Sequence, residues 1–362
     1  FFEKTIQVGA ISNSVGELNL LGGVLNLSVS GANLNVGNFS NAVGRCFVGN
    51  GFLNAVGRSF YLGAVPFGSG TLVQNGGVVS NSSVVLGCGS SSTGTLVVSN
   101  GVFYTANGLN VGNVSNATGV CEVDGGLLNV SGAITLGCST NSTGAFFMNG
   151  GVVSNAGLNV GNMLTSTGSV AITGGQLYAA GECYIGHGVA GKGGVATFSM
   201  SGGKLLTTYR WVVGSYGSAY AKISGGEIEA LRNPATGGTD QCLEIGRDPG
   251  TFGRLEMTGG ILKGTNELVI ARDGGSTGLV YVAGGDIYVN AIRRASGTNE
   301  LNLAGGTLHP YNRSTAFGFG ANLTNDIGYG NSGTVFGVNP VDKDGAERAM
   351  AVQGTFSGNG GL

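Results

Sequence analysis

Apolar side chains recur at fixed distances from a repeated glycine along most of the chain. The second glycine of a Gly-Gly or Asn-Gly pair returns about every 25 residues, from Gly23 to Gly306. Two apolar columns precede this glycine by three and five residues, with Gln74 as their one polar exception, and a third follows it by two residues. The third column comprises Leu25, Leu53, Val79, Phe103, Leu128, Val153, Leu177, Leu205, Ile228, Leu262, Ile287 and Leu308. Alternation with a period of two is typical of strands that bury one face.

A second glycine, usually ten or eleven residues after the first, ends another short alternating segment, such as the one containing Trp211 and Val213. Short strands separated by Gly, Asn and Ser corners leave no room for helices of useful length, so the chain must coil directly. We therefore predict an all-β fold, a right-handed parallel β-helix (β-solenoid) of about 12 rungs with three short strands per rung, over residues 1–308. Residues 309–362 abandon the repeat, and we predict a C-terminal non-repeat β segment that acts as a cap or as a strand-exchange segment.

The composition narrows the class of protein. The chain has 362 residues, including 73 glycines but only 5 prolines, is 41% hydrophobic and has a net charge of −2. This composition excludes collagen and argues against disorder. The near balance of acidic and basic residues favours no nucleic acid partner, and no unbroken apolar stretch is long enough for a membrane-spanning helix.

Two repeat units carry a resemblance to a known family. The segments GSVAITGGQLYAAGECYIG and GRLEMTGGILKGTNELVIA resemble the glycine-rich β-solenoid repeats of bacterial autotransporter passengers. The final VQGTFSGNGGL is similar to the opening of the autotransporter-associated strand repeat, which implies a natural chain continuing past Leu362. The resemblance implies a bacterial protein exported to the cell surface or the extracellular space, and Phe rather than Met at position 1 fits the removal of a leader.

One charged constellation is a candidate binding face. Arg247 and Arg272 fall in the same column of neighbouring rungs, with Asp248 and Asp273 beside them. β-Helix polysaccharide lyases and hydrolases place such groups on an outer sheet face, so a glycan site is one interpretation. The other, which we favour, is a solvated ladder of alternating charges with a structural role.

No residue is predicted to be catalytic, and no cofactor or metal is predicted. His187 and His309 lie in unrelated rungs without neighbouring ligands, so we expect exposed corners rather than a metal site. The rung alignment separates the six cysteines, so we expect free thiols, although Cys242 lies in a longer insertion and could cross-link subunits. We expect Trp211 in the core, and Tyr104, Tyr178 and Tyr288 in one outward column.

Charge is distributed unevenly, which suggests self-association. Residues 61–180 contain only Glu122 and Asp124 as charged groups, so these rungs have little electrostatic protection against association. Open β-helix ends also expose unpaired strand edges. We expect head-to-tail contacts between copies through apolar residues near the two ends, namely Phe1, Phe2, Ile6, Val8, Phe356 and Leu362.

The leading hypothesis is a non-enzymatic structural subunit of an extracellular bacterial fibre or surface layer that assembles head-to-tail with itself. A second hypothesis is an autotransporter-type adhesin or passenger that binds glycans or a host surface. A third is a β-helix polysaccharide lyase or hydrolase.

Overall fold

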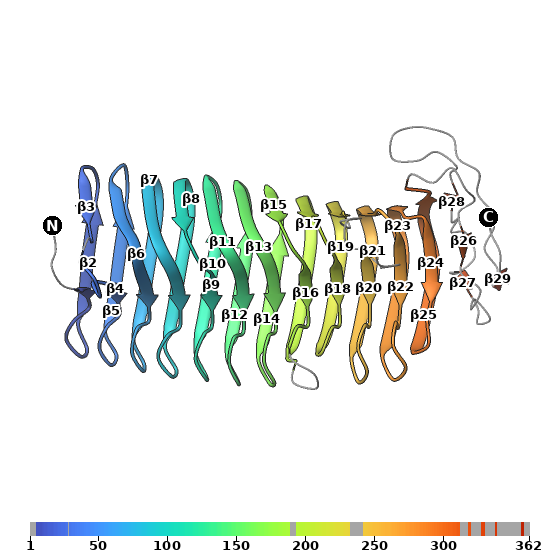
Figure 1. The fold of residues 1–362 in the computed structure, drawn as a ribbon, viewed down its shortest axis with the longest axis horizontal. Helices are drawn as coiled ribbons and strands as arrows, with labels where there is room; N and C mark the ends of the chain where they lie inside the picture. The colour runs from blue at the N-terminus through green and yellow to red at the C-terminus, as the bar shows by residue number, and fades with distance from the viewer. Residues whose placement is uncertain are drawn as a thin grey trace. The chain divides into compact units, whose positions relative to one another are not determined.

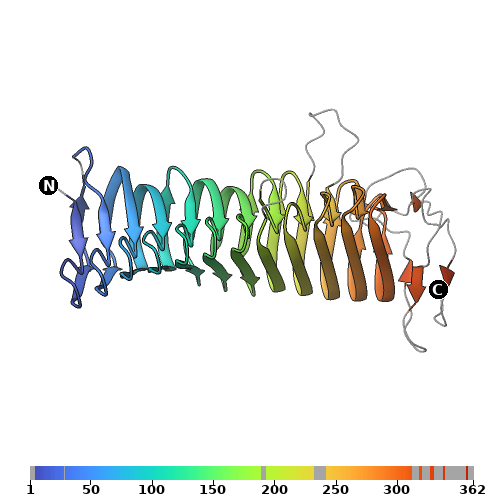
Figure 2. The same ribbon diagram turned by 90° about the horizontal axis from the view of Figure 1, so that it is seen from below.

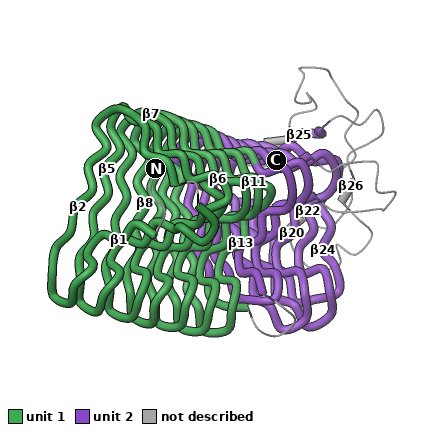
Figure 3. The backbone as a smooth tube through the Cα atoms, turned by 60° about the vertical axis from the view of Figure 1, so that its left-hand side comes forward, with its two compact units in different colours: residues 1–178, 192–195 green, residues 179–191, 196–362 purple. Residues whose placement is uncertain are grey.

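The computed structural model describes residues 5–27, 29–188, 193–231 and 242–311, together with short strands between residues 318 and 357. The chain divides into two compact units (Figure 3). Unit 1 comprises residues 1–178 with 192–195, and unit 2 comprises residues 179–191 with 196–362. Both units are all-β in their described parts, with parallel strands stacked as a β-solenoid of about 12 turns in total, as predicted.

Unit 1 is built from strands that pair in parallel with the equivalent strand of the next turn (Figure 1). The register repeats the sequence alignment, because Leu18 of β2 pairs with Cys46 of β5, which pairs with Leu72 of β7. The strands are β1 (Ile6–Val8), β2 (Val15–Leu20), β3 (Val24–Asn26), β4 (Leu34–Val36), β5 (Val43–Val48), β6 (Phe52–Leu62), β7 (Ser69–Leu86), β8 (Thr93–Thr105), β9 (Leu109–Val111), β10 (Thr118–Val123), β11 (Leu127–Leu136), β12 (Thr143–Met148), β13 (Val152–Val160), β14 (Thr167–Ile172) and β15 (Gln176–Ala179).

Unit 2 follows the same plan, and Figure 2 shows the stacking from a second direction. Its strands are β16 (Cys183–Ile185), β17 (Val195–Thr207), β18 (Trp211–Val213), β19 (Ser218–Ala230), β20 (Leu243–Ile245), β21 (Phe252–Gly264), β22 (Glu267–Ile270), β23 (Thr277–Tyr288), β24 (Ala291–Arg294) and β25 (Thr298–His309). Four further pieces are β26 (Gly318–Phe319), β27 (Ile327–Tyr329), β28 (Gly337–Val338) and β29 (Phe356–Ser357). β27 and β28 pair in parallel with β25, so part of the predicted C-terminal segment lies along the edge of the last complete turn.

The repeated apolar columns form the core of both units. Leu53, Val79 and Phe103 are fully buried, as is Trp211, which was expected inside. Gln74 is also fully buried, and its amide donates to the carbonyl oxygens of Gly76, Gly77 and Val102 at 3.0–3.2 Å. Backbone acceptors therefore satisfy the N–H groups of this polar exception, whereas its Oε1 is buried without a hydrogen-bond partner among the described residues.

The expected three short strands per turn are separate only in some turns. In the first turn β1, β2 and β3 are distinct, but β7 runs without interruption through 18 residues. The register between β7 and β8 shifts at Gln74/Asn75 and Asn75/Val78, beside the repeated glycine pair. The glycines thus act as bulges that bend a continuous strand, where separate strands were predicted.

The corner after the third strand is a recurring turn. An equivalent residue has a positive φ in successive turns of unit 1, namely Asn13, Asn41, Phe67, Ser91, Asn116, Asn141 and Thr165. The following residue donates its N–H back across the turn, for example Ala117 to the oxygen of Val114 at 3.0 Å. Asparagine tolerates the left-handed conformation better than most residues, which explains why it recurs at this corner.

The residues predicted for self-assembly are partly placed by the structure. Val8 lies in the core at 5% exposure, whereas Ile6 is half-buried, and both belong to β1, which pairs with β4. The backbone of Phe356 belongs to β29. Phe1, Phe2 and Leu362 lie outside the described residues. In the described part of the chain, we find no helix that is both long and apolar enough to cross a membrane.

Candidate functional site

The charged cluster predicted from sequence lies on unit 2, around the outward column of its third strands. Tyr184 of β16 is two turns away from Glu244 of β20, with Val212 of β18 between them in register. Arg247 and Arg272 occupy the corner after this strand in successive turns, where the N–H of Arg272 donates to the oxygen of Gly246 at 2.9 Å. The parallel stacking therefore brings together the four predicted residues, Arg247, Asp248, Arg272 and Asp273.

Glu244 is the centre of the cluster and is fully buried. Its carboxylate lies 3.4 Å from Nε of Arg247, 3.3 Å from Nη1 of Arg272 and 3.6 Å from Nη1 of Arg210. Burial raises the pKa of Glu244, and the three arginines oppose that rise. A carboxylate held by three cations is an ion-pair core that joins neighbouring turns.

The two aspartates of the cluster are also paired. Asp248 is 5% exposed and accepts a hydrogen bond from Ser215 at 3.1 Å, with Nη2 of Arg272 at 3.7 Å. Asp273 accepts two hydrogen bonds from Arg272, at 2.9 and 3.1 Å, and these hold its pKa below the usual range. The expectation of a solvated ladder is thus wrong for Asp248, because the arginine side chains and the neighbouring turns cover it.

An aromatic pair borders this cluster. Tyr184 donates to Glu182 at 2.5 Å and accepts a hydrogen bond from Arg247 at 3.0 Å, and burial together with Glu182 raises its pKa to about 12. His187 stacks on the Tyr184 ring at 4.7 Å and has a lowered pKa, chiefly through burial.

The expectation of exposed histidines is wrong. His309 is 6% exposed, stacks on Tyr288 at 4.2 Å, and lies 3.1 Å from Asp286. Its place at the end of β25 puts it against the preceding turn, a contact that only the register reveals. Across the described ranges, no group of three or more His, Cys, Asp and Glu side chains is placed to hold a metal ion.

All six cysteines are free, as predicted. Cys242 is fully buried, and burial raises its pKa to about 11, so the idea that it cross-links subunits is wrong for this structure.

Tyr104 and Tyr178 are 37% and 39% exposed, in agreement with an outward column.

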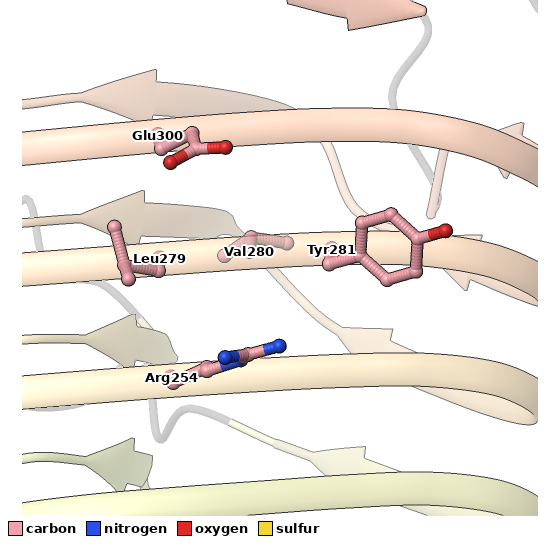
Figure 4. A pocket seen from close by; sticks show the side chains of 5 residues that line it. All are labelled: Arg254, Leu279, Val280, Tyr281 and Glu300. Atoms are coloured by element: carbon pink, nitrogen blue, oxygen red, sulfur yellow. The ribbon is translucent and has the colours of Figure 1, made fainter. Parts of the chain in front are cut away.

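The sequence reasoning missed a small pocket on the outer face of unit 2. It has a volume of about 160 Å³ and is lined by Arg254, Leu279, Val280, Tyr281 and Glu300 (Figure 4). These residues come from β21, β23 and β25, and the register sets Arg254, Leu279 and Glu300 side by side. The alternation in these strands could have identified the outward positions, but it could not show which of them enclose a space.

The reasoning also missed an apolar stripe on the outer face of unit 1. We define this apolar stripe as the outward column of Val24, Phe52, Val78, Val102, Leu127 and Val152, which are adjacent through the registers of successive turns. Val24 is 62% exposed and the other valines and Phe52 are 37–42% exposed. The signal was present in the sequence, since the residue after each repeated glycine is apolar in these turns.

Comparison with known proteins gives no relative. No family model, no curated protein and no solved structure matches this chain. The class of protein established here is a parallel β-solenoid repeat protein, and its function must be argued from its own surface.

Proposed function

We propose that this protein is a non-enzymatic structural subunit of an extracellular bacterial fibre or surface layer, whose copies associate through the apolar stripe of unit 1. The observation that carries the proposal is the stripe itself. Its six residues are spaced by one strand repeat of about 4.8 Å, so the stripe extends for roughly 24 Å. An apolar surface that is exposed at five of its six residues and half-buried at Leu127 is typical of an interaction site.

A second copy of the chain is the partner that fits this surface. The column beside the stripe consists of the uncharged residues Asn26, Asn54, Ser80, Tyr104, Asn129 and Ser154. A partner of this surface therefore needs no opposite charge and no side chain that inserts deeply between the turns. It needs a row of apolar side chains with the same spacing. Another copy offers that row. Two copies can therefore pair their identical stripes about a two-fold axis, because the spacing of the rows is the same in both.

The head-to-tail contact predicted from the sequence remains part of this proposal. Lateral contacts through the stripe would hold neighbouring columns of subunits together in a fibre or a layer. Export to the bacterial surface is supported by the resemblance of the repeats to autotransporter passengers.

The experiment compares two variants that carry equal added charge on different faces. Val78→Lys with Val102→Lys places two charges on the stripe, whereas Thr93→Lys with Thr143→Lys places two charges on exposed first-strand positions of the same unit. Sedimentation velocity and negative-stain microscopy should show laterally associated assemblies for the wild type and for the threonine variant, but only single subunits or single head-to-tail columns for the valine variant. A wild type that stays monomeric at every accessible concentration would rule the proposal out.

The adhesin hypothesis is the second candidate, and the pocket at Tyr281 favours it. The enzyme hypothesis has less support, because the carboxylates of Glu244, Asp248 and Asp273 are each held by arginine. A general acid or base needs a carboxyl group that can reach and exchange a proton with its substrate.

A further inference from the structure

The pocket at Tyr281 has an apolar base with a polar group on each side. Leu279 lies between Arg254 of the preceding turn and Glu300 of the following turn, so those two residues are about 10 Å apart along the stacking direction. Tyr281 follows two residues along β23 and is 36% exposed. Figure 4 shows the four side chains on the outer surface of three adjacent strands, whereas Val280 is turned inward at 1% exposure.

The charges around the pocket compensate one another. Nη2 of Arg254 lies 3.5 Å from Glu256, and Nζ of Lys222 lies 3.8 Å from the same carboxylate. Arg254 also lies over the Tyr220 ring at 5.6 Å. With Glu300 included, two positive and two negative side chains surround the pocket, so the local field favours an uncharged ligand over an acidic or a basic one.

The size and chemistry of the pocket limit the ligand further. The pocket volume of about 160 Å³ is well below the roughly 300–1,000 Å³ of sites that enclose drug-sized molecules. The pocket can therefore hold one ring of a ligand, and any further rings linked to it remain in solvent. The ligand must present a C–H face to Leu279 and Tyr281 and hydroxyl groups at opposite edges. Arg254 can donate to one edge, and Glu300 can accept from the other.

We infer that this pocket binds one uncharged pyranose ring of an oligosaccharide. The ring packs its C–H face on Tyr281 and Leu279, while Arg254 and Glu300 hydrogen-bond its hydroxyl groups. The site differs from the sequence-predicted glycan face at Arg247 and Arg272, whose charged groups are occupied by each other. The inference goes beyond the structural role proposed above and does not depend on self-association.

Saturation-transfer NMR tests this inference with defined probes. The neutral probes are maltotriose, mannotriose and N,N′,N″-triacetylchitotriose, and the charged probes are trigalacturonate, which is acidic, and deacetylated chitotriose, which is basic. At least one neutral trimer should receive saturation at its ring protons. Tyr281→Ala should weaken its binding about tenfold, because the stacking contact is lost, and Glu300→Ala should also weaken it.

The controls separate this site from other exposed aromatic residues and from assembly. Tyr104→Ala removes an outward tyrosine of similar exposure in unit 1 and should leave binding unchanged. The Val78→Lys, Val102→Lys variant should bind the trimer like the wild type even if it no longer assembles. The inference is overturned if no neutral trimer binds, if only trigalacturonate or deacetylated chitotriose binds, or if binding survives both Tyr281→Ala and Glu300→Ala in variants with unchanged melting temperature.

Discussion

At the scale of single residues, the first-strand glycines mark places where the backbone of a neighbouring segment leaves no room for a side chain. A Cβ atom on Gly119 would lie 2.2 Å from the nitrogen of Gly112 and 2.7 Å from the carbonyl carbon of Val111. These are backbone atoms and cannot rotate away. The glycine is therefore required by the close approach of the corner to the strand that follows it.

Gly119→Ala should destabilise the protein by about 2–3 kcal/mol, the upper range for overpacking, because the corner must shift to admit the methyl group. Gly22→Ala is the matched control, since a Cβ there meets nothing within 4 Å and the residue lacks a positive φ. Urea unfolding of the two variants should give a lowered midpoint only for Gly119→Ala. Equal midpoints would mean that the corner adapts at little cost.

Glu227 gives a pH dependence with a defined sign. Burial alone would raise its pKa, but hydrogen bonds from Lys204 at 3.0 Å and Lys263 at 3.1 Å outweigh burial and hold the pKa below the usual 4.5. A lowered pKa in the folded state stabilises the fold above the unfolded-state value, and this contribution is lost as the pH falls through the folded-state pKa.

Glu227→Gln should therefore lower the free energy of unfolding by about 1 kcal/mol at pH 7, since the pair is partly exposed to solvent. The difference from the wild type should shrink as the pH falls below 4.5. Denaturant unfolding at several pH values measures it. Glu122→Gln is the control, because Glu122 accepts a hydrogen bond from the neutral Asn149 amide. A difference that is constant with pH would show that the lysine contacts do not control this carboxyl group.

At the scale of the strands, much of the fold could be predicted from the alternation of apolar residues, but strand length and burial of the outer face could not. The columns around Leu53 and Val79 are inward as predicted, because a period of two defines a face. The same rule places Glu244 outward, yet the residue is fully buried. Its burial depends partly on Arg210 and Arg272, which the stacking brings from neighbouring turns, and a single sequence does not specify side-chain coverage across turns.

The corner turns provide a prediction at this scale. Phe67 has a φ of 60° at the corner position that four other turns of unit 1 fill with asparagine, and it is 60% exposed. A left-handed conformation costs a bulky residue about 1 kcal/mol, and asparagine adopts it more readily. Phe67→Asn should therefore raise the free energy of unfolding by up to about 1 kcal/mol, measured by denaturant titration.

Phe39→Asn serves as the comparison for this variant. Phe39 is 43% exposed in the equivalent corner of the preceding turn, but it has no positive φ. It should give no gain in stability. An equal gain in both variants would attribute the effect to the removal of an exposed aromatic ring rather than to the backbone conformation.

At the scale of the whole molecule, charge separates the chemistry of the two units. The chain between residues 61 and 180 carries only Glu122 and Asp124, whereas unit 2 contains both the ion-pair cluster around Glu244 and the pocket at Tyr281. Association through the apolar stripe would thus rest on apolar burial and not on ion pairs, and its dependence on salt tests this.

Association through the apolar stripe should persist at high ionic strength. Between 0.1 and 1 M salt the Debye length falls from about 10 Å to about 3 Å, which weakens contacts between exposed charges but leaves apolar burial intact. Sedimentation velocity at the two salt concentrations should therefore give a lateral association constant that is unchanged or higher at 1 M, while the Val78→Lys, Val102→Lys variant shows no lateral association at either concentration. A fall of tenfold or more at 1 M would instead assign the contact to charged side chains, because the stripe and the column beside it consist of uncharged residues.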